Sequence, residues 1–63
     1  MELSEIEFRI LLDYWIRRRN YARDCRWTNR RLKYKVQVIY WDEHYKNYDK
    51  KVRRIRKAMK EVQ

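Results

Sequence analysis

The chain contains no glycine and no proline in its 63 residues. Glycine supplies the positive φ angles of tight turns, and proline is the residue that most reliably ends a helix. A chain without either residue has few favoured places to turn, so it suits long helices joined by few connections. We therefore expect an all-α fold.

The start of a first helix is marked by a capping box. Ser4 and Glu7 have the S-x-x-E spacing, in which the serine hydroxyl accepts the backbone N–H three residues later. The carboxylate of Glu7 can reach back to the backbone N–H of Ser4. Leu3 and Phe8 flank this box at the spacing of a hydrophobic staple. The pattern predicts a helix that begins at about residue 4.

Apolar side chains recur four and three residues apart through the second half of the chain, which is the spacing of a helix-packing seam. Only Arg31 interrupts this stripe with a polar side chain. The predicted seam of the hairpin or dimer consists of Trp27, Tyr34, Val38, Trp41, Tyr45, Tyr48, Val52, Ile55 and Met59. On the first helix, one broad apolar face is predicted to contain Leu3, Ile6, Ile10, Leu11, Tyr14, Trp15, Tyr21, Ala22 and Cys25.

The break between the helices is expected near Asp24, Thr28 and Asn29, which are residues that favour turns and caps. We predict a single helical-hairpin domain over residues 1–63, with a helix over about 4–26, a turn over about 27–29 and a helix over about 30–62. A single unbroken helix is the alternative. Two helices cover only one side of each apolar stripe, so we also expect a homodimer that forms a four-helix bundle.

Residues 32–38 carry a competing pattern. Apolar and polar residues alternate there, and the apolar ones are β-branched, aromatic or leucine, as in a strand. Such a strand would have no partner in its own chain, although two copies could pair through it. The heptad stripe passes through the segment without a change of phase, which favours the helix.

Charge is distributed in blocks along the chain, whose net charge is +9. Residues 1–16 have four acids against Arg9, and residues 36–49 have three acids against Lys46. Residues 17–35 have nine bases against Asp24, and residues 50–63 have seven bases against Glu61. A hairpin sets the acidic first turns, with Glu2, Glu5 and Glu7, beside the basic last turns, with Arg53, Arg56 and Lys57. The block at 17–35 is then expected to lack an acidic partner.

Catalytic side chains are scarce. The chain has one histidine, His44, one cysteine, Cys25, and one serine, Ser4, so a nucleophile with its base or a set of metal ligands cannot easily be assembled. We expect no enzyme activity, no cofactor, no metal and no small-molecule substrate. The apolar runs are far shorter than the ~20 residues of a membrane span. These features predict a soluble, cytoplasmic protein that does not bind membranes.

The basic block at 17–35 is the predicted binding surface. Arginine forms paired hydrogen bonds with carboxylates and phosphates, so its abundance favours recognition of one of these groups. The candidate residues are Arg17, Arg18, Arg19, Arg23, Arg26, Arg30, Lys33 and Lys35. An acidic protein is the first candidate partner. The alternative is nucleic acid, with phosphates neutralised by the same bases.

The whole chain, which begins Met1-Glu2-Leu3-Ser4 and is short, basic and rich in tryptophan and tyrosine, resembles the small accessory proteins of the early exo–xis region of lambda-like bacteriophages. The resemblance rests on size and general character and carries over no functional residue. It implies a non-catalytic regulatory protein that acts in the cytoplasm of an infected bacterium, on a host process or on the choice between lysis and lysogeny.

Overall fold

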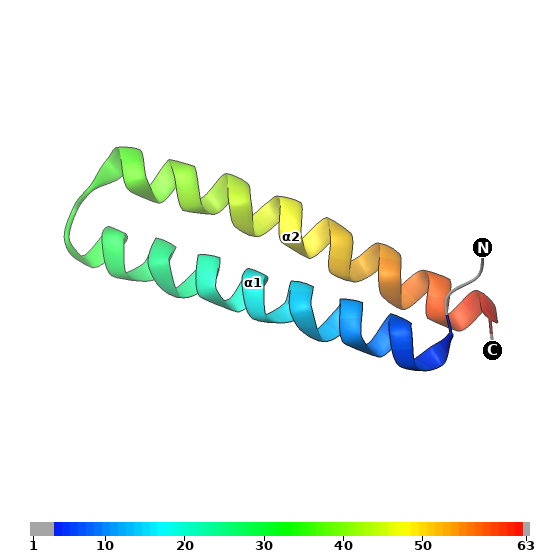
Figure 1. Cartoon of the computed structure of the whole chain (residues 1–63). Coiled ribbons are helices and arrows are strands. Elements are labelled where there is room, and N and C mark those ends of the chain that lie inside the picture. Colours follow the sequence, from blue (N-terminus) through cyan, green and yellow to red (C-terminus); the bar gives the residue numbers. More distant parts are fainter. Residues whose placement is uncertain (1–3, 63) are drawn as a thin grey trace.

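The computed structural model describes residues 4–62 and shows two helices, α1 (Glu5–Arg31) and α2 (Lys35–Val62). They lie side by side and antiparallel, and one short turn joins them at the end of the molecule opposite the start of α1 (Figure 1). The hairpin measures 44 × 16 × 14 Å. The predicted all-α hairpin is confirmed. The alternatives of a single helix and of a strand at 32–38 are wrong, because this segment forms the turn and the first turn of α2.

The capping box at the start of α1 is present. The Oγ of Ser4 accepts the backbone N–H of Glu7 at 3.2 Å, and Ser4 has the extended backbone of an N-cap. The side chain of Glu7 accepts the Ser4 hydroxyl at 3.1 Å, in place of the backbone N–H that the box predicts. Leu3, which the predicted staple requires, lies outside the described residues.

The turn between the helices comes later in the chain than the sequence predicts. α1 continues to Arg31, and Lys33 then adopts a left-handed backbone with φ 63°. The backbone N–H of Lys33 donates to the carbonyl of Arg30, and that of Tyr34 donates to the carbonyl of Asn29. These two bonds form a Schellman motif, in which glycine usually takes the left-handed position. Lysine holds it here, so a search for typical turn residues misses it.

The predicted turn at 27–29 is wrong because these residues continue α1. Asn29 belongs to a residue type that often competes with the helical backbone through its side chain. Its Nδ2 instead donates to the carbonyl of Cys25, four residues earlier, at 2.7 Å. The amide is therefore satisfied within the helix, and α1 passes through Thr28 and Asn29 without a break.

The core between the helices is small. Ala22 of α1 and Val52 of α2 are its fully buried residues. From Val38 onward, the predicted α2 stripe is half-buried or buried, since Val38, Trp41, Tyr45, Tyr48, Val52, Ile55 and Met59 all lose much of their exposure. Trp27 and Tyr34 do not belong to this part of the stripe. They remain 58% and 57% exposed, because the chain turns between them and Val38.

The apolar face predicted for α1 is mostly not the face that packs against α2. The residues of α1 that are buried or half-buried at seam spacing are Phe8, Leu12, Trp15, Arg19, Ala22, Arg26 and Asn29. In contrast, Ile6, Ile10, Tyr14 and Tyr21 remain exposed, at 71%, 65%, 46% and 61%. Ile6 and Ile10 fall on the opposite side of the helix, at 100° per residue. Tyr14 and Tyr21 lie nearer the side of α1 where the Tyr21 ring contacts Trp41 of α2, at 5.5 Å. We call these four exposed residues the outer stripe. α1 therefore has two apolar stripes, and only one is covered.

Candidate functional site

Two arginines of α1 are engaged by aspartates of α2. Arg19 Nη1 lies 3.1 Å from Asp49 Oδ1, and Arg26 Nη1 lies 2.8 Å from Asp42 Oδ1. The arginines are seven residues apart and so are the aspartates, so the same packing geometry repeats after two helical turns. These pairs fix the register in which the helices pack.

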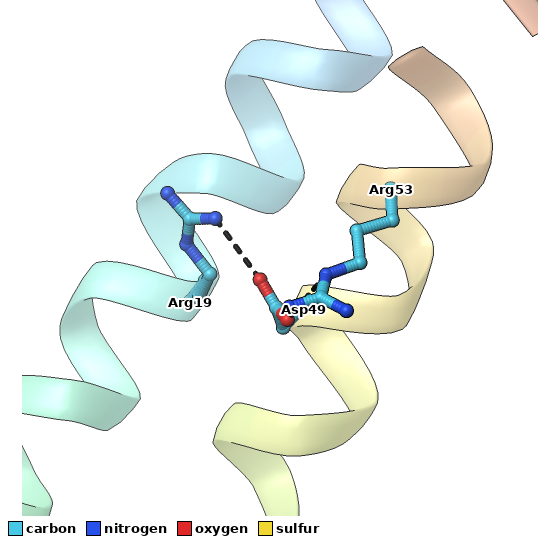
Figure 2. Close-up of polar contacts among 3 residues, drawn as sticks. All are labelled: Arg19, Asp49 and Arg53. Carbon is cyan, nitrogen blue, oxygen red and sulfur yellow. Dashed lines mark hydrogen bonds and ion pairs between the residues drawn. The ribbon is translucent and has the colours of Figure 1, made fainter. Parts of the chain in front are cut away.

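Each aspartate also accepts a base from its own helix. Arg53 Nε lies 3.0 Å from Asp49 Oδ2, so Asp49 joins Arg19 and Arg53 as Figure 2 shows. Lys46 Nζ lies 3.0 Å from Asp42 Oδ2 in the same way. Asp42 and Asp49 therefore bind a base with each carboxylate oxygen, and they define one flank of the hairpin as its ion-pair flank.

The basic block at 17–35 is thus partly neutralised, which corrects the expectation that it has no acidic partner. Arg19 and Arg26 are half-buried in the seam. Arg17 pairs with Asp13 at 3.0 Å, and Arg23 contacts Asp24 at 3.4 Å. Of the predicted binding residues, only Arg18, Arg30, Lys33 and Lys35 have no ion-pair partner among residues 4–62.

The unpaired bases of this block gather chiefly at the turn. Arg30 and Arg31 end α1, Lys33 occupies the turn and Lys35 begins α2. Exposed apolar side chains lie among them, so this end of the molecule is both basic and apolar. We call it the tip and define it as Trp27, Arg30, Arg31, Leu32, Lys33, Tyr34, Lys35, Val36, Ile39 and Tyr40. One shallow pocket there is lined by Arg30, Lys33, Lys35, Val38 and Ile39.

The flank opposite the ion pairs is aromatic. The Trp15 ring lies 5.7 Å from that of Tyr48, and His44 lies 5.8 Å from Tyr48 and 4.3 Å from Tyr40. Lys51 Nζ lies 4.4 Å from the centre of the Trp15 ring. The sequence pattern does not predict this group, because Trp15 meets Tyr48 and Lys51 only through the register of the hairpin.

The predicted approach of the acidic first turns to the basic last turns is not found in the region covered by the structure. Glu5 pairs with Arg9 at 3.0 Å in its own helix. Glu7 accepts the Ser4 hydroxyl, and Arg53 binds Asp49. Glu2 lies outside the described residues. The contacts that orient the helices are instead those of Asp42 and Asp49 in the middle of α2.

Comparison with family models, with curated proteins and with solved structures gives no match. Within residues 4–62, neither helix combines the length and the apolar content that a membrane span requires.

Acid is expected to weaken the hairpin through Asp42. The hydrogen bonds from Lys46 and Arg26 lower the pKa of Asp42 below its ordinary value. The ionised form of Asp42 therefore stabilises the folded state. This stabilisation is fully present above the pKa that Asp42 has in the unfolded chain, and it is lost as the pH falls through the lower pKa that Asp42 has in the folded chain. Unfolding in denaturant at pH 7 and at about pH 3 should show the Asp42→Asn variant less stable than wild type at pH 7, with the difference shrinking in acid.

The control for this experiment is Asp24→Asn, an identical change at a carboxylate that contacts only Arg23 beside it. It should cost little at either pH, because exposed pairs contribute little to stability. A deficit of Asp42→Asn that stays constant from pH 7 to about pH 3 would show that the charge of Asp42 is not what holds the helices.

Proposed function

We propose that this chain is a non-catalytic regulatory protein that binds an acidic protein partner through its tip. The observation that carries the proposal is the position of Arg30, Lys33 and Lys35. They are exposed, they have no ion-pair partner in the described part of the chain, and they surround uncovered apolar side chains. Basic and apolar groups in one patch fit a surface that carries carboxylates around an apolar anchor.

The apolar side chains of the tip favour a protein partner there over nucleic acid. Leu32, Val36 and Ile39 are 56%, 78% and 61% exposed. Aliphatic side chains offer no flat face on which a base can stack, whereas they do fill pockets between protein surfaces. A phosphate backbone would gain nothing from them. The exposed rings of Trp27, Tyr34 and Tyr40 at the tip suit either kind of partner, so it is the three aliphatic side chains that favour a protein able to bury them.

The backbone of the turn also supports a binding role for Lys33. A left-handed residue other than glycine costs roughly 1 kcal/mol or more. Glycine would take this position without that cost, yet lysine occupies it and places a positive charge in the turn that joins the two helices. Residues that keep a strained backbone are concentrated at functional sites.

We also propose that the chain forms a homodimer and that it acts in an infected bacterium. The exposed outer stripe of α1 supports pairing with a second copy of the chain, which would give the dimer two tips. The resemblance to early proteins of lambda-like phages supports a host protein as the partner, in the cytoplasm of an infected bacterium. Neither requires a cofactor or a bound substrate.

Reversing the charge of the tip is expected to abolish partner binding. In the triple variant Arg30→Glu, Lys33→Glu and Lys35→Glu, carboxylates replace the groups that attract the acidic partner. Capture from nuclease-treated bacterial lysate should show the retained acidic proteins reduced at least tenfold, roughly the factor that 1.4 kcal/mol represents. Circular dichroism should show unchanged helix content, because these side chains contribute nothing to the seam.

The matched control is Arg56→Glu, Lys57→Glu and Lys60→Glu, which exchanges one arginine and two exposed lysines at the far end of α2. It alters the net charge by the same amount and should retain the partner. Equal loss from both variants would mean that net charge alone matters. Loss of all retained protein on nuclease treatment of the wild type would favour the alternative, nucleic acid at this surface.

A further inference from the structure

The aromatic flank forms a second groove, and its Tyr48 lies about 20 Å from Lys35 of the tip along α2 at 1.5 Å per residue. The groove has a volume of about 500 Å³ and is lined by Trp15, His44, Tyr48, Lys50, Lys51 and Arg54, together with one amide side chain. We propose that this groove binds a single strand of nucleic acid, with the nucleobases stacked on its aromatic rings and the phosphates paired with its lysine and arginine side chains. The proposal is independent of the tip and of its protein partner.

The rings of the groove continue into a larger aromatic row. Trp15 contacts Tyr48, Tyr48 stacks with His44 at an interplanar angle of 26°, and His44 meets Tyr40. Tyr14 extends the row on α1, with its ring 4.9 Å from that of Trp15. In single-strand-binding proteins, successive nucleobases stack on aromatic side chains of this kind inside a positively charged channel.

The charge of the groove is of one sign. No acidic side chain lines it, whereas Lys50, Lys51 and Arg54 do. None of these three has an ion-pair partner among residues 4–62. The aspartates that join the helices, Asp42 and Asp49, are engaged on the opposite flank. Glu43 directly precedes His44 on α2 but does not line the groove, so the lining itself keeps a positive charge.

Lys51 and Trp15 suggest how a nucleotide would enter. The ammonium lies 4.4 Å from the centre of the indole ring, so the face of Trp15 is occupied by a cation that can move. A phosphate attracts that ammonium more strongly than a ring does, because it carries a full negative charge. Movement of Lys51 to the phosphate would open the indole face to the attached base.

The composition of the groove favours a strand over an acidic protein. Its apolar surface comes from rings, and aliphatic side chains like those of the tip do not line it. Every base has a flat face, so such a groove accepts bases with little regard to sequence. A duplex keeps its bases stacked on one another and cannot offer them to the rings. We therefore expect binding to be specific for single strands and tolerant of sequence.

The test is a titration of the full chain with a strand of about twelve thymidines, followed by tryptophan fluorescence at several salt concentrations. Lys50→Glu with Lys51→Glu should weaken binding at least tenfold relative to Lys57→Glu with Lys60→Glu, which makes the same charge change on the same helix. The slope of log affinity against log salt should also flatten by about 0.7 for each phosphate that the variant no longer neutralises. A strand of the same length without bases should bind at least about tenfold more weakly, because it has nothing to stack on the rings.

Four outcomes would overturn the proposal. They are the absence of binding by the wild type, equal losses from the two lysine pairs, equal affinity for the strand without bases, and tighter binding of a duplex of the same length. Binding that the Arg30→Glu, Lys33→Glu and Lys35→Glu variant loses, and that Lys50→Glu with Lys51→Glu keeps, would also contradict it. That result would place the strand at the tip. Failure of the groove in any of the other ways leaves the protein partner of the tip untouched.

Discussion

Replacing Val52 with aspartate is expected to unfold most of the chain. Val52 is 0% exposed and, with Ala22, forms the fully buried part of the core. A carboxylate at this position would be buried among apolar groups without a partner, which costs several kcal/mol. A domain of this size has on the order of 5 kcal/mol of stability. Circular dichroism at 25 °C should therefore show loss of most of the helical signal.

The matched control is Val36→Asp on the same helix. Val36 is 78% exposed in the first turn of α2, where no acidic residue is present. A carboxylate near the start of a helix interacts favourably with the helix dipole, so this variant should be at least as helical as the wild type. A fully folded Val52→Asp variant, with a melting temperature within a few degrees of wild type, would mean that the interior of the hairpin is open to water.

The sequence predicts the α2 half of the core well, and the reason is visible in its pattern. From Val38 to Met59, apolar residues recur at seam spacing, and they are the residues that α1 covers. The stripe failed only at its beginning. Trp27 and Tyr34 continue the same spacing, but a left-handed Lys33 turns the chain between them and Val38. Because nothing in lysine favours that conformation, periodicity could not reveal where the second helix begins.

The α1 half of the core was predicted poorly, because hydrophobicity points to the wrong face. Ile6, Ile10 and Tyr14 make the outer stripe more apolar than the packed one, which contains Arg19 and Arg26. A helix face that contains arginines is predicted to be exposed, unless carboxylates are known to pair with those arginines. One feature of the sequence could have identified the packed face. Arg19 and Arg26 are seven residues apart, and so are Asp42 and Asp49. Only an alignment of the two helices in antiparallel register relates the two pairs.

The same register explains why the binding surfaces were only partly predicted. It neutralises the middle of the basic block and leaves the bases of the turn free, so the candidate site shrinks toward Arg30, Lys33 and Lys35. The register also gives the two flanks of the hairpin different side chains. Acids of α2 that pair with α1 lie on one flank, while the rings around Trp15 and Tyr48 lie on the other. Surfaces made by two helices together cannot be read from either helix alone.

A second copy of the chain is expected to cover the outer stripe, so that light scattering at micromolar concentration gives about twice the 8.3 kDa of one chain. One hairpin buries few side chains. Its accessible surface is 5622 Å², whereas a compact protein of this mass exposes about 4,600 Å². A stable interface needs ~800 Å² from each partner, and the excess is of that order. Ile6, Ile10 and Tyr14 supply an apolar contact along α1, and Tyr21 extends it beyond Arg17 and Arg18.

In the expected dimer, charge favours an antiparallel arrangement of the two α1 helices. The first half of α1 has three acids, Glu5, Glu7 and Asp13, against Arg9. Residues 17–26 have five arginines against Asp24. An antiparallel pair sets the acidic half of each copy beside the basic half of the other, whereas a parallel pair would set like charges together. We therefore expect a two-fold symmetric four-helix bundle with its tips at opposite ends.

Replacing Ile10 with glutamate should dissociate this dimer. The change puts an unpaired charge into the apolar outer stripe of both copies, where the interface would bury it. Sedimentation should then give the mass of one chain at concentrations where the wild type is dimeric. Ile39→Glu is the matched control, because the same residue type is 61% exposed at the tip and 65% exposed at Ile10. A monomeric wild type would refute the dimer, and dissociation by Ile39→Glu alone would move its interface from the outer stripe to the tip.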